Sequence, residues 1–146
     1  MIKMKNDDLL NAVEPVIIHG CNCFNTMGAG VARQIAMKYP TAWVADQKTK
    51  KGDKSKLGRY SYATGNDGKI IINAYTQFEY GRDKELIYYD ALETVLHSIC
   101  KDFDTTKYFA MPKIGCGLAG GDWDKVKSIL KGVSTYYDKV FTVYYL

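Results

Sequence analysis

The hydrophobic pattern of the chain alternates between short apolar runs and longer segments with helical periodicity. The short runs are rich in β-branched or aromatic residues and predict strands over 15–19, 58–64, 69–75, 107–112 and 139–145. The run "KIIINAY" at 69–75 is almost continuously apolar, which is typical of a strand covered on both faces. Before it, Asn66, Asp67 and Gly68 predict a hairpin turn, because Asp-Gly tolerates positive φ.

The longer segments place apolar residues on one side at helical spacing. They predict helices over 28–39, 84–100 and 122–136, with a shorter helix over 7–13. Pro40 closes the first helix, and Asp122 is a natural N-cap for the last. Strands that alternate with helices of this length predict an α/β sandwich, in which helices cover both faces of a sheet.

The composition is that of a globular protein. The 146 residues suit one domain, 1–146, and 47% of them are hydrophobic and 25% charged. No apolar run approaches the roughly 18 residues that cross a membrane, and residues 1–5 lack the features of a signal peptide. We therefore expect a cytoplasmic protein with no membrane partner.

Charge is concentrated in one segment. Much of the formal charge of +4 comes from residues 48–59, "KTKKGDKSKLGR". Such a run predicts a solvated loop or, alternatively, a basic patch that draws in a polyanionic ligand or nucleic acid.

Two glycine-rich loops each follow a predicted strand and lead into a predicted helix. They read "GCNCFNTMGAG" after 15–19 and "KIGCGLAGGDW" after 107–112. Ligands of open α/β sheets bind at such places, and glycines and helix N-terminal amides there receive oxyanions. Two loops on one edge predict a clamp around a diphosphate. No Gly-Lys-Ser/Thr follows the glycines, which disfavours a kinase with a Walker motif.

The thiols and imidazoles offer weaker alternatives. Cys21 and Cys23 beside His19 lack the further ligands and spacing of a zinc site. A cysteine nucleophile needs a paired histidine, but His19 ends the strand two residues before Cys21 and His97 lies within the predicted helix 84–100, which disfavours this site too. We expect His19 to be structural, bonding to loop backbone, and His97 to lie on the surface. The four cysteines are expected to be small buried thiols: Cys21, Cys23, Cys100 and Cys116.

Several motifs along the chain resemble the macro domain family. These are "KNDDLL", "HGCN" with "MGAGVA", "PKIGCGLAGGDW" and "FTVYYL", which together extend from about residue 3 to 146. More narrowly, they resemble the branch of ADP-ribose-1''-phosphate phosphatases and terminal ADP-ribose protein glycohydrolases. The resemblance implies a three-layer α/β/α sandwich with a mixed, mostly parallel central sheet. It also implies a monomer that binds ADP-ribose or a derivative, with ADP-ribosylated protein or nucleic acid as a further partner, and that needs neither metal nor cofactor.

The resemblance further assigns positions to the ligand. Asp8 would accept a hydrogen bond from the adenine amino group, Leu9 would give a backbone contact, and Leu146 would line the adenosine side. Asn22 would lie beside the distal ribose. The remaining expected contacts with the phosphates and that ribose are Cys23, Met27, Gly28, Ala29, Gly30, Val31, Ala32, Thr76, Lys113, Ile114, Gly115, Cys116, Gly117, Leu118 and Ala119.

The catalytic positions are where the sequence departs from its family. Glycohydrolases of this branch use a lysine on the mid-sheet strand and an aspartate directly after Gly-Cys-Gly-Leu. Here those positions fall within 74–77 ("AYTQ") and on Ala119, so both groups are missing. Asp122 either only caps its helix or acts as a base on a water aimed at C1'' or the phosphate. Asn22 and Asp122 are the expected catalytic residues.

Two functions of different classes follow. The first is a hydrolase acting at C1'' of ADP-ribose, which removes phosphate from ADP-ribose-1''-phosphate or releases ADP-ribose from modified macromolecules. The second is a non-catalytic ADP-ribose reader, which the missing lysine and aspartate favour. The hydrolase is favoured by Asn22 and Asp122. A third and more remote interpretation is a nucleic-acid binder that uses the lysines of 48–59.

Overall fold

The computed structural model describes residues 1–81, 85–117 and 119–146. Six strands form one sheet in the order β1-β6-β5-β2-β4-β3. All neighbouring strands are parallel except β3 and β4, which are antiparallel. The strands are β1 (Ile2–Asn6), β2 (Val16–Cys21), β3 (Tyr60–Thr64), β4 (Ile70–Tyr75), β5 (Tyr108–Met111) and β6 (Val140–Tyr145).

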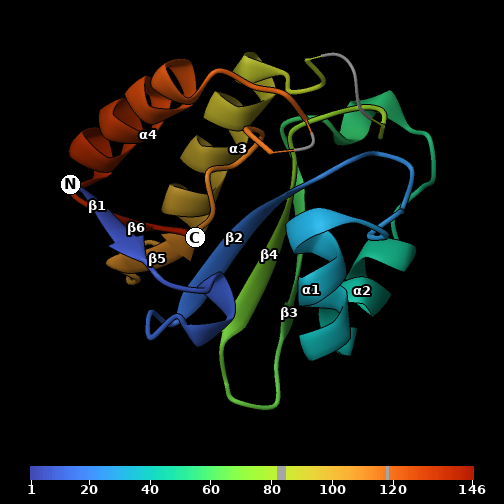
Figure 1. The fold of residues 1–146 in the computed structure, drawn as a ribbon, viewed down its shortest axis with the longest axis horizontal. Helices are drawn as coiled ribbons and strands as arrows, with labels where there is room; N and C mark the ends of the chain where they lie inside the picture. The colour runs from blue at the N-terminus through green and yellow to red at the C-terminus, as the bar shows by residue number, and fades with distance from the viewer. Residues whose placement is uncertain (82–84, 118) are drawn as a thin grey trace.

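Four α-helices cover the two faces of this sheet. Helices α3 and α4 lie on one face, and α1 and α2 lie on the other (Figure 1). The predicted three-layer sandwich with a mixed, mostly parallel sheet is confirmed. The helices are α1 (Gly30–Lys38), α2 (Pro40–Gln47), α3 (Tyr89–Asp102) and α4 (Trp123–Tyr137), with 3₁₀ turns at η1 (Leu9–Asn11) and η2 (Lys54–Lys56).

Successive residues of the central strands supply both halves of the core. Ile18 and Ile72 pack beneath α3 and α4, whereas Ile17 and Ile71 pack beneath α1 and α2. Consecutive side chains of a strand point to opposite faces, so a strand buried on both sides is apolar throughout. This explains the continuous apolar run at 69–75.

Two elements were missed by the pattern. Strand β1 reads "IKMKN", and four of its five residues are exposed because it forms the edge of the sheet. Helix α2 begins at Pro40, which ends α1 and also occupies the first turn of the next helix, where its missing N–H costs nothing.

Other boundaries differ more modestly. The hairpin between β3 and β4 forms as predicted, with Gly68 at a φ of +83°. The helix predicted over 84–100 begins at Tyr89, and Lys84 lies outside the described residues. The short helix predicted over 7–13 is the three-residue turn η1. Over the described ranges, no helix combines the length and apolar character needed to span a bilayer.

Candidate functional site

The centre of the sheet contains a topological switch point. Strands β2 and β5 are parallel neighbours, but β2 leads into α1 on one face and β5 leads into α4 on the other (Figure 1). The two following loops therefore diverge at the carboxyl ends of the strands, which is the usual ligand position in such sheets. Both glycine-rich loops lie here.

The candidate residues follow the carboxyl ends of all five parallel strands. Asp8 comes shortly after β1, Leu146 after β6, residues 113–117 and 119 after β5, Asn22 after β2 and Thr76 after β4. Since these strands run in one direction, the structure places the candidates along one edge, in the strand order β1, β6, β5, β2, β4.

The adenosine candidates lie at the β1–β6 end of this edge. Asp8 Oδ1 accepts a hydrogen bond from the Leu10 amide at 2.9 Å and thereby caps η1, in which Leu9 is buried. Leu146 is 92% exposed at the chain end.

In the β2–α1 loop, the Asn22 side chain organises the backbone. Its Nδ2 donates to Thr26 O at 2.9 Å and Thr26 Oγ1 at 2.8 Å, and its Oδ1 accepts from the Phe24 amide at 2.8 Å. An amide oxygen has two lone pairs, so Oδ1 keeps the capacity to accept one more hydrogen bond.

The N-terminus of α1 presents open backbone amides. Ala29 is the N-cap without a side-chain cap bond, and the residues from Gly28 to Val31 are exposed. Cys23 and Met27 of the preceding loop are buried, and Ala32 is half-buried. Uncapped amides at a helix N-terminus favour an anion.

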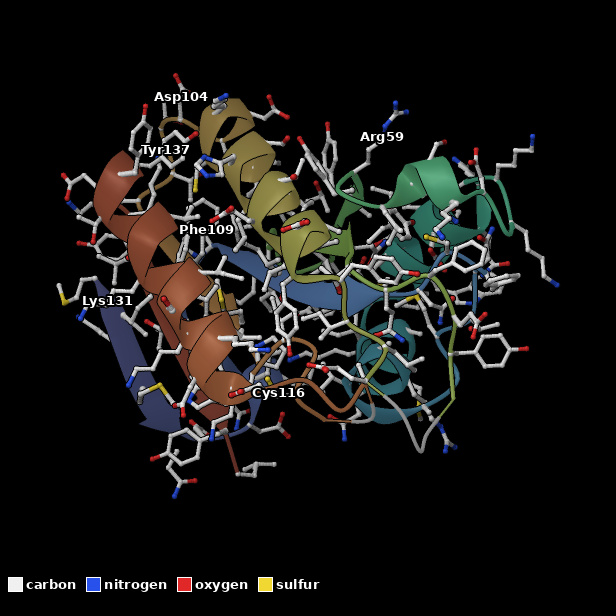
Figure 2. All side chains as sticks on the ribbon, turned by 90° about the horizontal axis from the view of Figure 1, so that it is seen from above. Arg59, Asp104, Phe109, Cys116, Lys131 and Tyr137 are labelled. Atoms are coloured by element: carbon white, nitrogen blue, oxygen red, sulfur yellow. The ribbon has the colours of Figure 1, made fainter. Side chains whose placement is uncertain are left out.

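The β5–α4 loop is tightly packed at two glycines and open at a third. A Cβ on Gly115, whose φ is +74°, would collide with the Ile87 side chain, and one on Gly121 would lie 2.5 Å from the Gly115 carbonyl oxygen. Gly117 is exposed, and a Cβ added there would have no other atom within 4 Å. Ile114 is buried, and Cys116 marks the loop near the N-terminal end of α4 in Figure 2.

Two further residues of this loop have defined surroundings. The Lys113 ammonium lies 5.4 Å from the centre of the Trp123 ring and 5.3 Å from that of Tyr145. Ala119 is buried, and its carbonyl oxygen accepts the Leu86 amide at 2.7 Å. The position of the family's aspartate thus holds a buried methyl group. Leu118 lies outside the described residues.

Three strand ends meet at this switch point. A Cβ on Gly20 would lie 2.9 Å from Thr76 Oγ1 and 3.1 Å from Ile114 Cγ2, so a side chain at position 20 would separate the two loops. Thr76 is fully buried, and its hydroxyl has no hydrogen-bond partner among the described residues. A buried hydroxyl without a hydrogen-bond partner lowers the stability of the fold.

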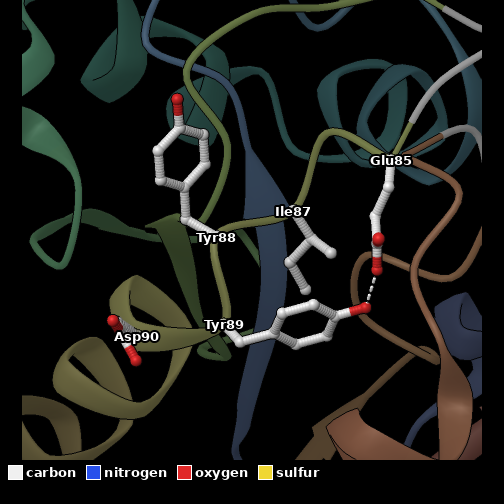
Figure 3. A pocket seen from close by; sticks show the side chains of 5 residues that line it. All are labelled: Glu85, Ile87, Tyr88, Tyr89 and Asp90. Atoms are coloured by element: carbon white, nitrogen blue, oxygen red, sulfur yellow. Dashed lines mark hydrogen bonds between the residues drawn. The ribbon is translucent and has the colours of Figure 1, made fainter.

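Asp122 caps α4 as predicted. Its Oδ1 accepts the Asp124 amide at 2.9 Å, the side chain is exposed, and its own amide donates to the Tyr89 hydroxyl at 3.0 Å. Tyr89 in turn donates to Glu85 across a depression of about 440 Å³ (Figure 3). The Tyr88 ring points away from this pair, and Ile87 and Asp90 complete the lining.

The histidines differ from their predicted surroundings. His19 is fully buried and bonds through Nε2 to the Asn73 side-chain oxygen at 2.7 Å, so the predicted bond to loop backbone is wrong. Burial lowers the pKa of His19 to about 4, which leaves a neutral structural imidazole. His97 is half-buried against the Tyr137 hydroxyl at 2.8 Å, and not a plain surface residue.

The cysteines are thiols with little nucleophilic character. Three of the four are buried as predicted, whereas Cys116 is only half-buried. Cys21 Sγ lies 3.7 Å from His19 Nε2, but burial raises the pKa of this thiol well above its usual value. Burial also raises the pKa of Cys23. Among the residues that the structure describes, no three His, Cys, Asp or Glu side chains are grouped to hold a metal ion.

One residue that positions the site was missed. Lys56 was assigned to a solvated loop, yet it is buried, and its ammonium donates to Cys23 O at 3.1 Å and to Asn25 Oδ1 at 2.7 Å. The other basic residues of that segment are exposed: Lys48, Lys50, Lys51, Lys54 and Arg59. Nothing in the local sequence separates Lys56 from its neighbours, because its partners lie some 30 residues earlier in the chain.

Comparison with known proteins agrees with this geometry. The sequence model of the family described as "Macro domain" matches residues 18–130. An uncharacterized 17.5 kDa protein of Enterobacteria phage T4 is 38% identical over 132 residues, which cover 85% of this chain and 81% of the phage protein.

Two mycobacterial comparisons add detail. A protein named DNA ADP-ribosyl glycohydrolase from Mycobacterium tuberculosis is 32% identical over 133 residues, 89% of this chain but only 38% of the mycobacterial protein. The solved macrodomain of Mycobacterium tuberculosis DarG superposes with a TM-score of 0.81 at 28% identity, covering 99% of this chain and 97% of that one.

Proposed function

Because this chain belongs to the macro domain family, we propose that it binds ADP-ribose along the carboxyl edge of its sheet and hydrolyses the bond at C1''. The observation that carries the proposal is the pair of glycine-rich loops at the β2–β5 switch point. An elongated edge with an anion-binding helix end at its middle suits a ligand that carries a diphosphate between two other groups.

The order of the strands orients the ligand. The adenosine lies at the β1–β6 end, near Asp8 and Leu146, and the diphosphate lies between the α1 N-terminus and the loop at Gly117. The distal ribose then reaches Asn22, whose free lone pair accepts a ribose hydroxyl. With the distal ribose in this position, C1'' lies near Thr76.

The chemistry assigned to Asp122 is that of a general base. Its exposed carboxylate at the start of α4 orients a water and takes its proton as the oxygen adds at C1'' or at the phosphate. Addition at C1'' breaks the bond from C1'' to the leaving group, and addition at phosphorus breaks the bond from phosphorus to the C1'' oxygen. In either case the departing atom takes up a proton, so one water is consumed. A capped helix end holds the carboxylate in a fixed position, which favours this role over that of a freely rotating surface group.

Two leaving groups are considered. The mycobacterial relative is named for ADP-ribosylated DNA, which favours release of ADP-ribose from a nucleic acid or another macromolecule. The sequence "AGGDW" at 119–123 resembles the phosphatase-type members and favours ADP-ribose-1''-phosphate. Both reactions use the same site and the same end of the ligand.

A non-catalytic reader is the second candidate. It is favoured by the buried Ala119 at the family's aspartate position and by "AYTQ" at 74–77, where the family's lysine is missing. Under this alternative the edge binds ADP-ribose, and Asp122 serves only as an N-cap.

Calorimetry with ADP-ribose, followed by turnover assays on the same sample, tests the proposal. ADP-ribose-1''-phosphate reports phosphate release, and an oligonucleotide and a protein carrying ADP-ribose report glycosidic cleavage. Binding with release of any of these groups supports the hydrolase. Binding without release supports the reader, and absence of ADP-ribose binding contradicts both.

A further inference from the structure

A second surface adjoins the distal-ribose end of the site. It consists of three lysines from the segment before β3 and three aromatic residues from the segment between β4 and α3, and we call it the lysine–aromatic surface. Its members are Lys50, Lys51, Lys54, Phe78, Tyr80 and Tyr88.

Two of the three aromatic side chains of this surface are exposed to solvent, and the third, Phe78, is half-buried. Tyr80 is 62% exposed and Tyr88 is 41% exposed. Beneath them, the rings of Phe24 and Phe78 pack edge to face at 4.9 Å, and Phe24 and Tyr80 do so at 6.2 Å. Exposed rings held in this way offer faces on which planar groups can stack.

Positive charge surrounds these rings. The Lys54 ammonium lies 5.5 Å from the centre of the Phe78 ring and 5.7 Å from that of Tyr88, and Lys50 and Lys51 are exposed beside it in the chain. The acidic residues in the same two segments are Asp53, whose carboxylate caps η2 by accepting the Ser55 amide, and Glu79, Asp83 and Glu85, against eight lysines and arginines. The surface therefore carries a net positive charge.

Hydrogen bonds connect the surface to the candidate site. Cys23 donates its amide to Phe78 O at 3.0 Å, and its carbonyl oxygen accepts the Gly52 amide at 2.7 Å. The Phe24 amide donates to Asn22 Oδ1. Cys23, the chain neighbour of Asn22, thus joins the loop of the proposed distal-ribose contact to both segments of the lysine–aromatic surface.

We propose that this surface binds a single-stranded nucleic acid, with phosphates on Lys50, Lys51 and Lys54 and bases stacked on Tyr80 and Tyr88. Cations beside exposed aromatic faces are the combination that single strands require, whereas an acidic peptide needs only the cations. Strand binding does not depend on the proposed function. Only its consequence rests on that function, namely that a bound strand would lie at the C1'' end of ADP-ribose.

Fluorescence anisotropy with a labelled oligothymidylate of about 12 nucleotides tests the binding, measured from low to high salt. The Lys50→Gln/Lys51→Gln pair should weaken binding about 25-fold at 0.1 M salt and reduce the salt slope by about 1.4, since each lost phosphate contact removes about 0.7. The matched control is Lys127→Gln/Lys131→Gln, two exposed lysines of α4, with the same change of net charge. This control should stay within twofold.

A second pair of variants tests stacking. Tyr80→Ala should weaken strand binding at least fivefold, since stacking on one ring contributes about five- to 150-fold, and Tyr80→Phe should restore it. Tyr136→Ala, which removes an exposed ring from α4, should leave strand binding unchanged.

Calorimetry with free ADP-ribose on the lysine variants separates this inference from the proposed function. Unchanged ADP-ribose affinity with weakened strand binding supports the lysine–aromatic surface. If wild type fails to bind ADP-ribose but strand binding follows the predicted pattern, the proposed function is contradicted and the inference about the lysine–aromatic surface is supported. Equal losses in both lysine pairs, no strand binding by wild type, or equally strong displacement by polyglutamate would each overturn the inference.

Discussion

The ammonium of Lys56 and the amide oxygen of Asn25 lie 2.7 Å apart, beneath the loop that carries Asn22. Asn25 adopts a left-handed φ of +57°, and Gln47 donates to its carbonyl oxygen at 2.7 Å. Burial lowers the pKa of Lys56, and the charge of the buried Asp46 opposes that shift. The buried Lys56 ammonium has its hydrogen-bond acceptors in the β2–α1 loop, and these bonds fix the conformation of that loop.

Replacement of Lys56 by Met should lower the free energy of unfolding by about 2–4 kcal/mol, because Asp46 loses its nearby cation and Cys23 O and Asn25 Oδ1 each lose one of their donors. Lys54→Met, two residues away and exposed, should cost no more than about 0.5 kcal/mol. Urea denaturation of both variants measures the difference. Similar midpoints for the two would show that Lys56 is not structurally required.

Loss of stability below neutral pH should depend on His19. Its pKa is about 4 in the folded protein and about 6.5 when unfolded, so the unfolded chain binds more protons between these values. The contribution of His19 is therefore complete above pH 6.5 and is lost as the pH falls toward 4, by up to about 3 kcal/mol.

The control for this prediction is His19→Gln, which keeps a polar partner for Asn73 but does not titrate. Urea midpoints at pH 7.5 and pH 5 should differ more for wild type than for the variant. If the two proteins lose stability in parallel, other groups account for the acid sensitivity.

The central strands and the two site loops could be predicted because their signals are local. Consecutive Ile residues at 70–72 indicate a strand buried on both faces, and glycines after strands indicate backbone approached by a ligand. Strand β1 escaped prediction because an edge strand needs few apolar residues, and its parallel partner β6 lies at the other end of the chain.

The finer structure of the site could not be predicted because it depends on distant contacts. Lys56 resembles every lysine around it until the fold brings Cys23 and Asn25 over it. In the same way, the partner of His19 is Asn73, 54 residues later, and no sequence spacing indicates that the neighbouring strand supplies it.

Gly117→Glu should abolish ADP-ribose binding without unfolding the protein. Position 117 is exposed with open space around it, so a side chain fits, but a carboxylate there repels the diphosphate. Gly117→Ala should retain ADP-ribose affinity within about threefold and show that size alone is tolerated. Calorimetry on both variants, with thermal unfolding as the folding check, gives the answer. Wild-type affinity in Gly117→Glu would refute the diphosphate clamp.

Asp122 combines a structural and a proposed chemical role, which two substitutions separate. Asn keeps an oxygen that caps α4 but cannot take a proton, so Asp122→Asn should lower turnover at least about 100-fold with little change in stability. Asp122→Ala should lose the same activity and also about 1 kcal/mol of stability, since the Asp124 amide loses its acceptor. ADP-ribose affinity should stay within a few fold in both variants. Asp124→Asn, which removes a negative charge two residues later in the first turn of the same helix, is the control for charge and should remain active. Full turnover by Asp122→Asn would assign this residue to capping alone and would require another group to activate the water.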